Sequence, residues 1–134
     1  MNASRLVAVL LIGGAAPALA EPREESVAPL VQKALPGIAG KQFTAAIVMF
    51  PPRARAVPHR HGGAFLYAYV LDGNVRSQIE GEPVRTYRVG QGWTEEPGAH
   101  HVLTENASTR KPARLLVTFV SSEGEPLKIP DAQR

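Results

Sequence analysis

The chain has 134 residues, with 15 Lys and Arg against 12 Asp and Glu, four His and no Cys. This length fits one domain, and a content of 44% hydrophobic and 20% charged residues is typical of a globular protein, which excludes disordered and collagen-like chains. The absence of cysteine excludes disulfides, thiolate metal sites, iron–sulfur clusters and cysteine nucleophiles.

Residues 1–20 have the pattern of a signal peptide. Arg5 supplies the basic start, residues 6–16 are uncharged and mostly apolar, and residues 18–20 (Ala-Leu-Ala) fit a cleavage site. The apolar stretch is shorter than the roughly 20 residues that a membrane-spanning helix needs. We therefore expect an exported protein, periplasmic or secreted if its source is bacterial, with no stable membrane span after cleavage.

The charge that remains after cleavage excludes one class of partner. Loss of Arg5 leaves 14 basic and 12 acidic residues, and the Lys and Arg residues are scattered without a run or interleaved aromatic residues. Proteins that bind nucleic acid carry a basic patch or stripe. We therefore expect no nucleic-acid partner.

The elements predicted along the chain begin with a helix and continue with strands. Within an N-terminal segment at residues 21–42, Ser26 is a candidate cap for a short helix at residues 27–35, and Pro36-Gly37 is its stop signal. Beyond this segment the sequence changes to short β-like runs separated by turn residues. The predicted strands are residues 43–50, 65–71, 74–79, 84–89, 93–95, 101–105 and 114–120.

Turn signals between these runs indicate how the strands connect. Asp72-Gly73 is a strong two-residue hairpin signal, and Gly90-Gln91-Gly92 makes a later turn. Short strands at this spacing predict an all-β fold, a closed antiparallel sandwich or barrel over residues 43–120. The tail at residues 121–134 is expected to lie on the surface.

The four histidines form two pairs, His59-x-His61 and the adjacent His100-His101. Residues two apart on a strand face the same side, so His59 and His61 are suited to binding one metal ion. A third histidine from a distant strand would complete the set, and only one of the adjacent pair can share that face. The alternative is that these are hydrogen-bonded or surface histidines, but two pairs beside turn-forming glycines favour a metal site.

The sequence around these histidines resembles the two motifs of the cupin superfamily, in a small single-domain protein of the cupin-2 type. Residues 58–63 (Pro-His-Arg-His-Gly-Gly) followed by residues 69–73 resemble the first motif, which contains HxH, an acidic residue and a closing glycine. Gly90, Gly98 and His101 resemble the second motif.

The resemblance implies a double-stranded β-helix, or jelly-roll, barrel. It also implies that His59, His61 and His101 bind a divalent transition metal, which is Fe, Zn, Mn, Ni or Cu, since imidazole accommodates most of these ions. If the register is shifted by one residue, His100 replaces His101. Small cupins commonly dimerise through sheet edges, so a homodimer is expected, with the aromatic run at residues 65–71 as a candidate contact.

The sequence departs from the family pattern at the acidic ligand. The glutamate of the first motif falls on Leu66 when counted back from Gly73, or on Phe65 when counted from His61, and neither side chain binds metal. Three neutral imidazoles leave the charge of the metal uncompensated, so such a site would be a stronger Lewis acid that attracts an anion or hydroxide.

Several residues near the motifs are candidates for proton transfer, with Tyr67 and Glu96 selected as catalytic. Glu96 lies beside the second motif and is a candidate replacement for the lost carboxylate. Tyr69, Gln78 and Glu95 are further candidates by proximity. The alternatives are that the tyrosines pack on one strand face and that residues 95–96 form a solvated turn, which is the favoured interpretation of the two glutamates.

These features predict a metal-dependent, oxygenase- or isomerase-like protein that acts on a small molecule, with a dioxygenase as the leading enzyme class. A non-catalytic metal or small-ligand binding module, such as a sensory domain, is the alternative. A third possibility is an inert jelly-roll domain that serves assembly.

Overall fold

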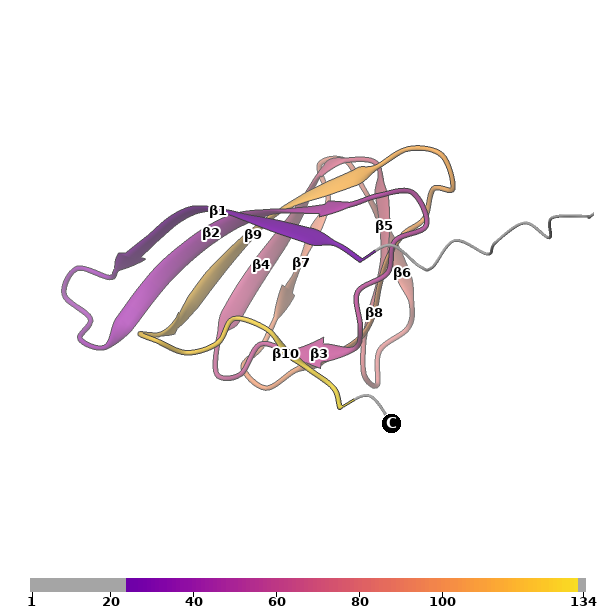
Figure 1. Ribbon diagram of the computed structural model, residues 1–134. Coiled ribbons are helices and arrows are strands. Elements are labelled where there is room, and N and C mark those ends of the chain that lie inside the picture. The colour runs from indigo at the N-terminus through magenta and orange to yellow at the C-terminus, as the bar shows by residue number, and fades with distance from the viewer. Residues whose placement is uncertain (1–23, 133–134) are drawn as a thin grey trace, which may run out of the picture.

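The structure is a computed structural model that describes residues 24–132, and over this range the regular elements are strands, with no helix. Figure 1 shows them as two sheets that pack against each other. The strands are β1 (Ser26–Ala34), β2 (Lys41–Phe50), β3 (His59–Arg60), β4 (Phe65–Asp72), β5 (Asn74–Ile79), β6 (Arg85–Arg88), β7 (Gly92–Glu95), β8 (His100–Asn106), β9 (Ala113–Ser122) and β10 (Ile129–Pro130).

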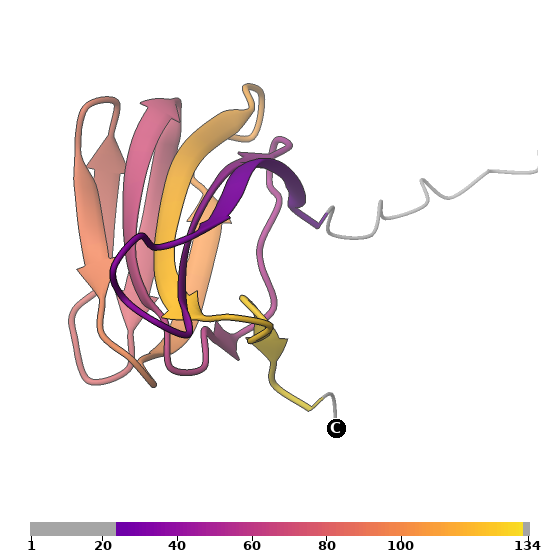
Figure 2. The same cartoon turned by 90° about the vertical axis from the view of Figure 1, so that its left-hand side faces the viewer.

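Each sheet has five antiparallel strands. Their orders are β1-β2-β9-β4-β7 in the first sheet and β10-β3-β8-β5-β6 in the second, so neighbours in space are often distant in sequence. Figure 2 shows the two layers from the side, with the C-terminal strand close to β3. This arrangement confirms the all-β jelly-roll fold that the sequence predicts, and seven of the strands lie where the turn signals place them.

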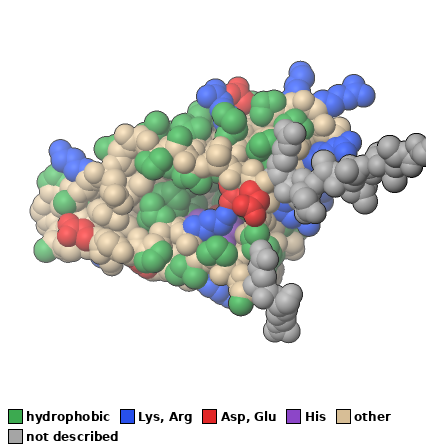
Figure 3. Space-filling view, viewed as in Figure 1, with side chains coloured by type: hydrophobic (Ala, Val, Ile, Leu, Met, Phe, Trp, Pro, Cys, Tyr) green, Lys and Arg blue, Asp and Glu red, His purple; other side chains and the backbone are tan. Residues whose placement is uncertain are grey.

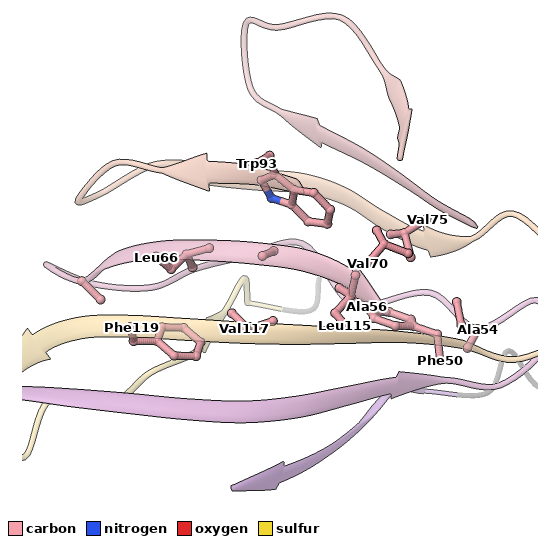
Figure 4. Close-up of a cluster of buried hydrophobic side chains, with 13 residues drawn as sticks. Phe50, Ala54, Ala56, Leu66, Val70, Val75, Trp93, Leu115, Val117 and Phe119 are labelled. Carbon is pink, nitrogen blue, oxygen red and sulfur yellow. The ribbon is translucent and has the colours of Figure 1, made fainter. Parts of the chain in front are cut away.

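The core lies between the sheets and follows from the alternation of side chains along the strands. In β4, Leu66, Ala68 and Val70 are buried while Phe65 and Tyr67 are exposed, as expected for a sheet with one face against the core. Figure 4 shows Leu66 and Val70 beside Leu115, Val117 and Phe119 of β9, on the inner face of the first sheet.

The predicted helix at residues 27–35 is wrong, because this segment is β1. It pairs antiparallel with β2, with Ala28 opposite Ile47 and Gln32 opposite Thr44. Pro36-Gly37 ends the element as expected, but as the turn of a hairpin, with φ of 79° at Gly37. A nine-residue helix is marginal in isolation, whereas pairing along β2 gives backbone hydrogen-bond partners to one side of the segment, which forms the edge of the first sheet.

Two short strands, β3 and β10, were not predicted from the sequence. They show that the C-terminal tail is part of a sheet. β10 pairs with β3, with Ile129 opposite Arg60 and Pro130 opposite His59, so the tail is joined to the HxH segment. The predicted signal peptide lies outside the described residues. Residues 24–132 contain no helix long and apolar enough to cross a membrane.

Candidate metal centre

The structure brings His59, His61 and His101 together, with one ring nitrogen from each lying within 4.8 Å of the others. His59 stands in β3 opposite His101 in β8, and His61 follows directly after β3. The ring centroid of His59 is 4.7 Å from that of His61 and 5.2 Å from that of His101. His59 and His101 are buried, and His61 is half-buried.

Backbone carbonyl groups orient the rings of the HxH pair. The Nδ1 of His59 donates to the carbonyl oxygen of Val57 at 2.7 Å, and the Nδ1 of His61 donates to that of Leu127. With the proton on Nδ1, the Nε2 lone pair of each ring is available to a metal. A hydrogen bond of this kind fixes both the tautomer and the orientation of a metal-binding histidine.

Burial keeps these two rings neutral. It lowers the pKa of His59 from 6.5 to about 4, with smaller contributions from the neighbouring His61 and His101 and an opposing one from the Val57 carbonyl. Burial also lowers the pKa of His61, against the opposing effect of the Glu95 carboxylate. Metal binding requires the neutral form of histidine, which both rings hold at neutral pH.

Both nitrogens of His101 have partners. Its Nδ1 donates to Glu95 Oε1 at 2.9 Å, and its Nε2 lies 2.8 Å from the hydroxyl oxygens of Ser77 and Thr104. A metal ion bound by His101 would therefore replace one of these hydrogen bonds. The choice between the adjacent histidines is clear in the structure, because His100 faces outward and contacts Glu80 at 3.3 Å and Asp131 at 2.8 Å.

A buried carboxylate accompanies the three histidines. Glu95 in β7 is 3% exposed, and its Oε1 also accepts a hydrogen bond from Trp93 Nε1 at 3.0 Å. Burial raises the pKa of Glu95, but the hydrogen bond from His101 and the charges of His101 and His61 outweigh it, so the pKa is lowered overall. Glu95 is therefore ionised at neutral pH.

The second oxygen of this carboxylate indicates that a cation fits the site. Glu95 Oε2 is buried without a hydrogen-bond partner and lies 3.6 Å from His61 Nε2. An ionised oxygen in that position is costly unless a positive charge stands beside it. Three imidazoles together with this oxygen form a donor set that suits a divalent transition metal.

The position of the acid corrects the sequence analysis in part. Leu66 lies where the family pattern expects glutamate, and it is buried. The carboxylate comes instead from Glu95, its cross-strand partner in the β4–β7 pair. Glu96, the predicted replacement, is exposed. It follows Glu95 directly, and because side chains alternate along an extended segment, the side chain of Glu96 points to the opposite face from that of Glu95.

The two residues predicted to be catalytic, Tyr67 and Glu96, do not meet the histidines. Tyr67 lies on the outer face of β4 and is 41% exposed, and Tyr69 shares that face, with its ring centroid 6.4 Å from that of Tyr67. Gln78 donates to the carbonyl oxygen of Glu82 at the surface. None of these side chains lines the cavity beside the histidines.

The C-terminal segment holds the loop that carries His61. The Glu125 carboxylate accepts hydrogen bonds from the backbone N–H of Gly63 and from that of Ser122, and these two bonds lower its pKa. Gly62, next to His61, has φ of 59°, and a Cβ there would collide with the Glu125 carboxylate. Nothing in the sequence signalled this role, because single residues far from the motifs provide these contacts.

The three histidines open into a cavity of about 140 Å³ between the sheets. Figure 3 shows it as a hollow with apolar side chains inside and an acidic and a basic group in contact at its margin. Glu25 and Lys128 line the cavity and form an ion pair, which joins the two ends of the described chain. The apolar lining residues are Val27, Pro29, Ala46, Val48, Phe50, Ala56, Leu66, Ala68, Trp93, Leu115, Val117, Phe119 and Leu127.

Comparison with known proteins identifies the family. A family model described as "Cupin domain" matches residues 46–119, more than half of the chain. No match is found among curated proteins. Similar solved structures include a protein with a double-stranded β-helix domain from Klebsiella pneumoniae, with a TM-score of 0.63 and 14% identity over 82% of this chain and 86% of that one.

Two enzymes are also similar in structure. One is the DMSP lyase DddQ from Ruegeria pomeroyi, with a TM-score of 0.64 and 20% identity over 81% of this chain and 54% of that one. The other is an oxalate oxidase in complex with the substrate analogue glycolate, with a TM-score of 0.63 and 23% identity over 82% of this chain and 56% of that one. The chain thus spans little more than half the length of either enzyme, and these likenesses show the fold. The family match over most of the barrel, with the two sheets and the gathered histidines, shows that the chain belongs to the cupin family.

Proposed function

We propose that this chain binds one divalent transition metal through His59, His61 and His101 and acts on a small molecule in the adjoining cavity, with oxygenase- or isomerase-like chemistry. The observation that carries the proposal is a set of three ring nitrogens within 4.8 Å beside a buried, unpartnered carboxylate oxygen. Solved structures of similar fold include two enzymes, a DMSP lyase and an oxalate oxidase in complex with a substrate analogue, which supports a small-molecule ligand.

The residues of the site have separate tasks in this proposal. When bound, the metal supplies Lewis-acid or redox chemistry, and imidazole ligands suit Fe, Zn, Mn, Ni or Cu. Glu95 offsets part of the metal charge and accepts a hydrogen bond from His101 Nδ1. The apolar walls exclude water, which strengthens the electrostatic interactions inside the cavity.

One observation favours a second candidate, a non-catalytic metal or small-ligand binding module. Of the carboxylates that line the cavity, Glu95 is already hydrogen-bonded to His101 and Trp93, and Glu25 is paired with Lys128. The described lining therefore offers no free general acid or base. An enzyme of this kind would depend on the metal and its open positions for chemistry.

Metal analysis tests the shared part of both candidates. Purified protein is expected to carry close to one equivalent of a divalent transition metal by elemental analysis. The substitutions His59→Ala, His61→Ala and His101→Ala are expected to abolish this content, whereas His100→Ala, on the outer face, serves as the matched control. Full metal retention in His61→Ala would overturn the site.

Oxygen consumption separates the enzyme from the binding module. The protein loaded with each candidate metal is supplied with diketones, thiols and phenolic compounds while dissolved oxygen is recorded. Uptake that disappears in His61→Ala supports the oxygenase. No uptake with any metal shifts the proposal to the binding module.

We also propose export and a homodimer. Export is supported by the apolar residues 6–16 and the Ala-Leu-Ala pattern at residues 18–20. β4 lies between β9 and β7, so the aromatic run it carries cannot pair along a sheet edge. Its outer face exposes Phe65 and Tyr67, with Val120 opposite Phe65, and this apolar surface is the proposed contact with a second copy.

A further inference from the structure

The walls of the cavity restrict the chemistry of its ligand. Besides the three histidines, its polar lining residues are Thr44, Thr104, Glu25, Lys128 and Glu95. Thr104 is engaged with His101, and Thr44 accepts a long hydrogen bond of 3.5 Å from Gln32. A ligand with several hydroxyl or amide groups would lose its bonds to water and find few partners on these walls, which disfavours sugars and peptides.

The volume sets the size of the ligand. A cavity of about 140 Å³ is below the range of about 300–1,000 Å³ that is typical for drug-sized ligands. An apolar protein cavity of about 150 Å³ binds benzene. The body of the ligand is therefore a single compact ring or a short branched chain.

The charges of the lining set the charge of the ligand. Glu25 and Lys128 neutralise each other, and the Glu95 carboxylate lies beside the histidines, with Oε1 2.9 Å from His101 Nδ1 and Oε2 3.6 Å from His61 Nε2. A divalent metal bound at the three histidines would leave one positive charge after the Glu95 carboxylate is counted. One anionic group balances that charge, whereas a second would be buried against apolar walls without compensation.

We infer that the cavity takes a small apolar monoanion, a carboxylate or enolate whose body is about the size of benzene and whose charged oxygen atoms face the three histidines. This inference rests on the proposed function, because the charge count includes a bound metal. It goes further by excluding neutral, polyhydroxylated and dianionic ligands and those with two fused rings.

Calorimetric titration of the zinc-loaded full chain tests this ligand class. Benzoate and cyclohexanecarboxylate are the probes. Three further compounds each change one property: benzyl alcohol removes the negative charge, phthalate adds a second one, and 2-naphthoate adds a second fused ring. We expect each of the last three to bind at least tenfold more weakly than benzoate. Benzoate is also expected to bind at least tenfold more weakly to the metal-free protein.

A pair of substitutions in β2 places the ligand in the cavity. Val48 lines the cavity, whereas Met49 is 42% exposed on the other side of the strand. Val48→Phe is expected to reduce benzoate affinity at least tenfold with zinc content unchanged, and Met49→Phe, the matched control, is expected to leave both unchanged.

The outcomes distinguish a failure of metal binding from a failure of the inferred ligand class. A chain that takes up no metal refutes the proposed function. A chain that binds zinc but binds phthalate, 2-naphthoate or benzyl alcohol as tightly as benzoate, or that binds no benzoate, refutes the ligand class alone. Equal benzoate affinity with and without zinc refutes the charge argument, and unchanged affinity in Val48→Phe refutes the location.

Discussion

Leu66 and Glu95 face each other across the β4–β7 pair, both with buried side chains that line the same cavity. The first occupies the position where the family pattern has an acidic ligand, and the second supplies a carboxylate on the neighbouring strand. Cross-strand partners in an antiparallel sheet have Cβ atoms about 5 Å apart, so a long side chain on either strand reaches the same region. The carboxylate of this site therefore comes from β7, whereas the family pattern expects it from β4.

Replacing Glu95 tests whether this carboxylate serves the metal. Glu95→Gln keeps the shape of the side chain but removes its charge, so zinc affinity is expected to fall roughly 10–100-fold, as for other residues that orient or neutralise metal ligands. Competition with a chromophoric chelator measures this affinity. Glu96→Gln, one residue along and exposed, is the matched control and is expected to bind zinc as the unmodified chain does.

A double substitution tests whether the two positions are equivalent. Glu95→Leu alone is expected to weaken zinc binding, and adding Leu66→Glu is expected to restore part of the loss because the acid then returns from the opposite strand. If the double variant binds zinc no better than Glu95→Leu, a carboxylate at position 66 cannot replace one at position 95, and the two positions are not equivalent.

Glu125 is expected to influence the metal through His61. Glu125→Ala removes the acceptor for the Gly63 N–H and loosens the loop behind His61, so cobalt affinity should fall several-fold. The visible spectrum of bound cobalt reports ligand geometry and should change as well, which a loss of stability alone would not cause. Glu125→Gln retains an acceptor oxygen, so it is expected to keep much of the cobalt affinity that Glu125→Ala loses. Glu123→Ala changes an exposed glutamate nearby and is the control, with cobalt affinity expected to be unchanged.

The metal-free protein should lose stability on acidification. The pKa of His59 is about 4 in the folded protein against 6.5 ordinarily, so between these values the unfolded chain binds the proton more readily. The free energy of unfolding therefore falls as the pH drops from 6.5 towards 4, by up to roughly 3 kcal/mol. The lowered pKa of Glu95 acts in the same direction at lower pH, since its contribution is present above the ordinary value and is lost as the pH falls through the folded one.

Urea unfolding at a series of pH values measures this dependence. His59→Gln cannot take up the proton and should show a shallower loss between pH 6.5 and 4 than the unmodified chain. A slope that is identical in the two proteins would contradict the assignment of the effect to His59.

The outer face of β4 should control self-association. Tyr67→Lys places a charge within the exposed apolar surface, so the dimer fraction in sedimentation experiments is expected to fall while metal content stays unchanged. Val84→Lys alters a similarly exposed apolar residue elsewhere, and it is expected to leave association unchanged. A chain that is monomeric before any substitution would exclude the proposed dimer.

Local patterns predicted much of the barrel. Alternation and turn residues located β4 and β5, and the chain turns at Asp72-Gly73 with φ of 73° at Gly73. The predicted hairpin at this turn is wrong, because β4 and β5 lie in different sheets and do not pair. The same patterns failed for β1, because a Ser cap and a Pro-Gly stop also fit a strand that ends in a hairpin. Pairing with β2 decided the outcome, and that pairing is a tertiary property.

The histidines were predictable, but the groups around them were only partly so. The spacing of His59 and His61 pointed to one face, and the two motifs indicated His101 as their partner. Glu95 was among several candidates, and the buried Trp93 two residues earlier is the signal that selects it over Glu96. The roles of Glu125 and Leu127 depend on chain packing that no local pattern encodes.

The contact between Leu127 and His61, together with the pairing of Pro130 with His59, sets the timing of site assembly. A chain emerging from the ribosome exposes both histidines well before the residues that orient them have been synthesised. The histidines can therefore be held in their final geometry only after residue 130 has been synthesised. If the three histidines hold a metal, the ions present in the compartment where residues 127–130 fold into place would decide which one is bound.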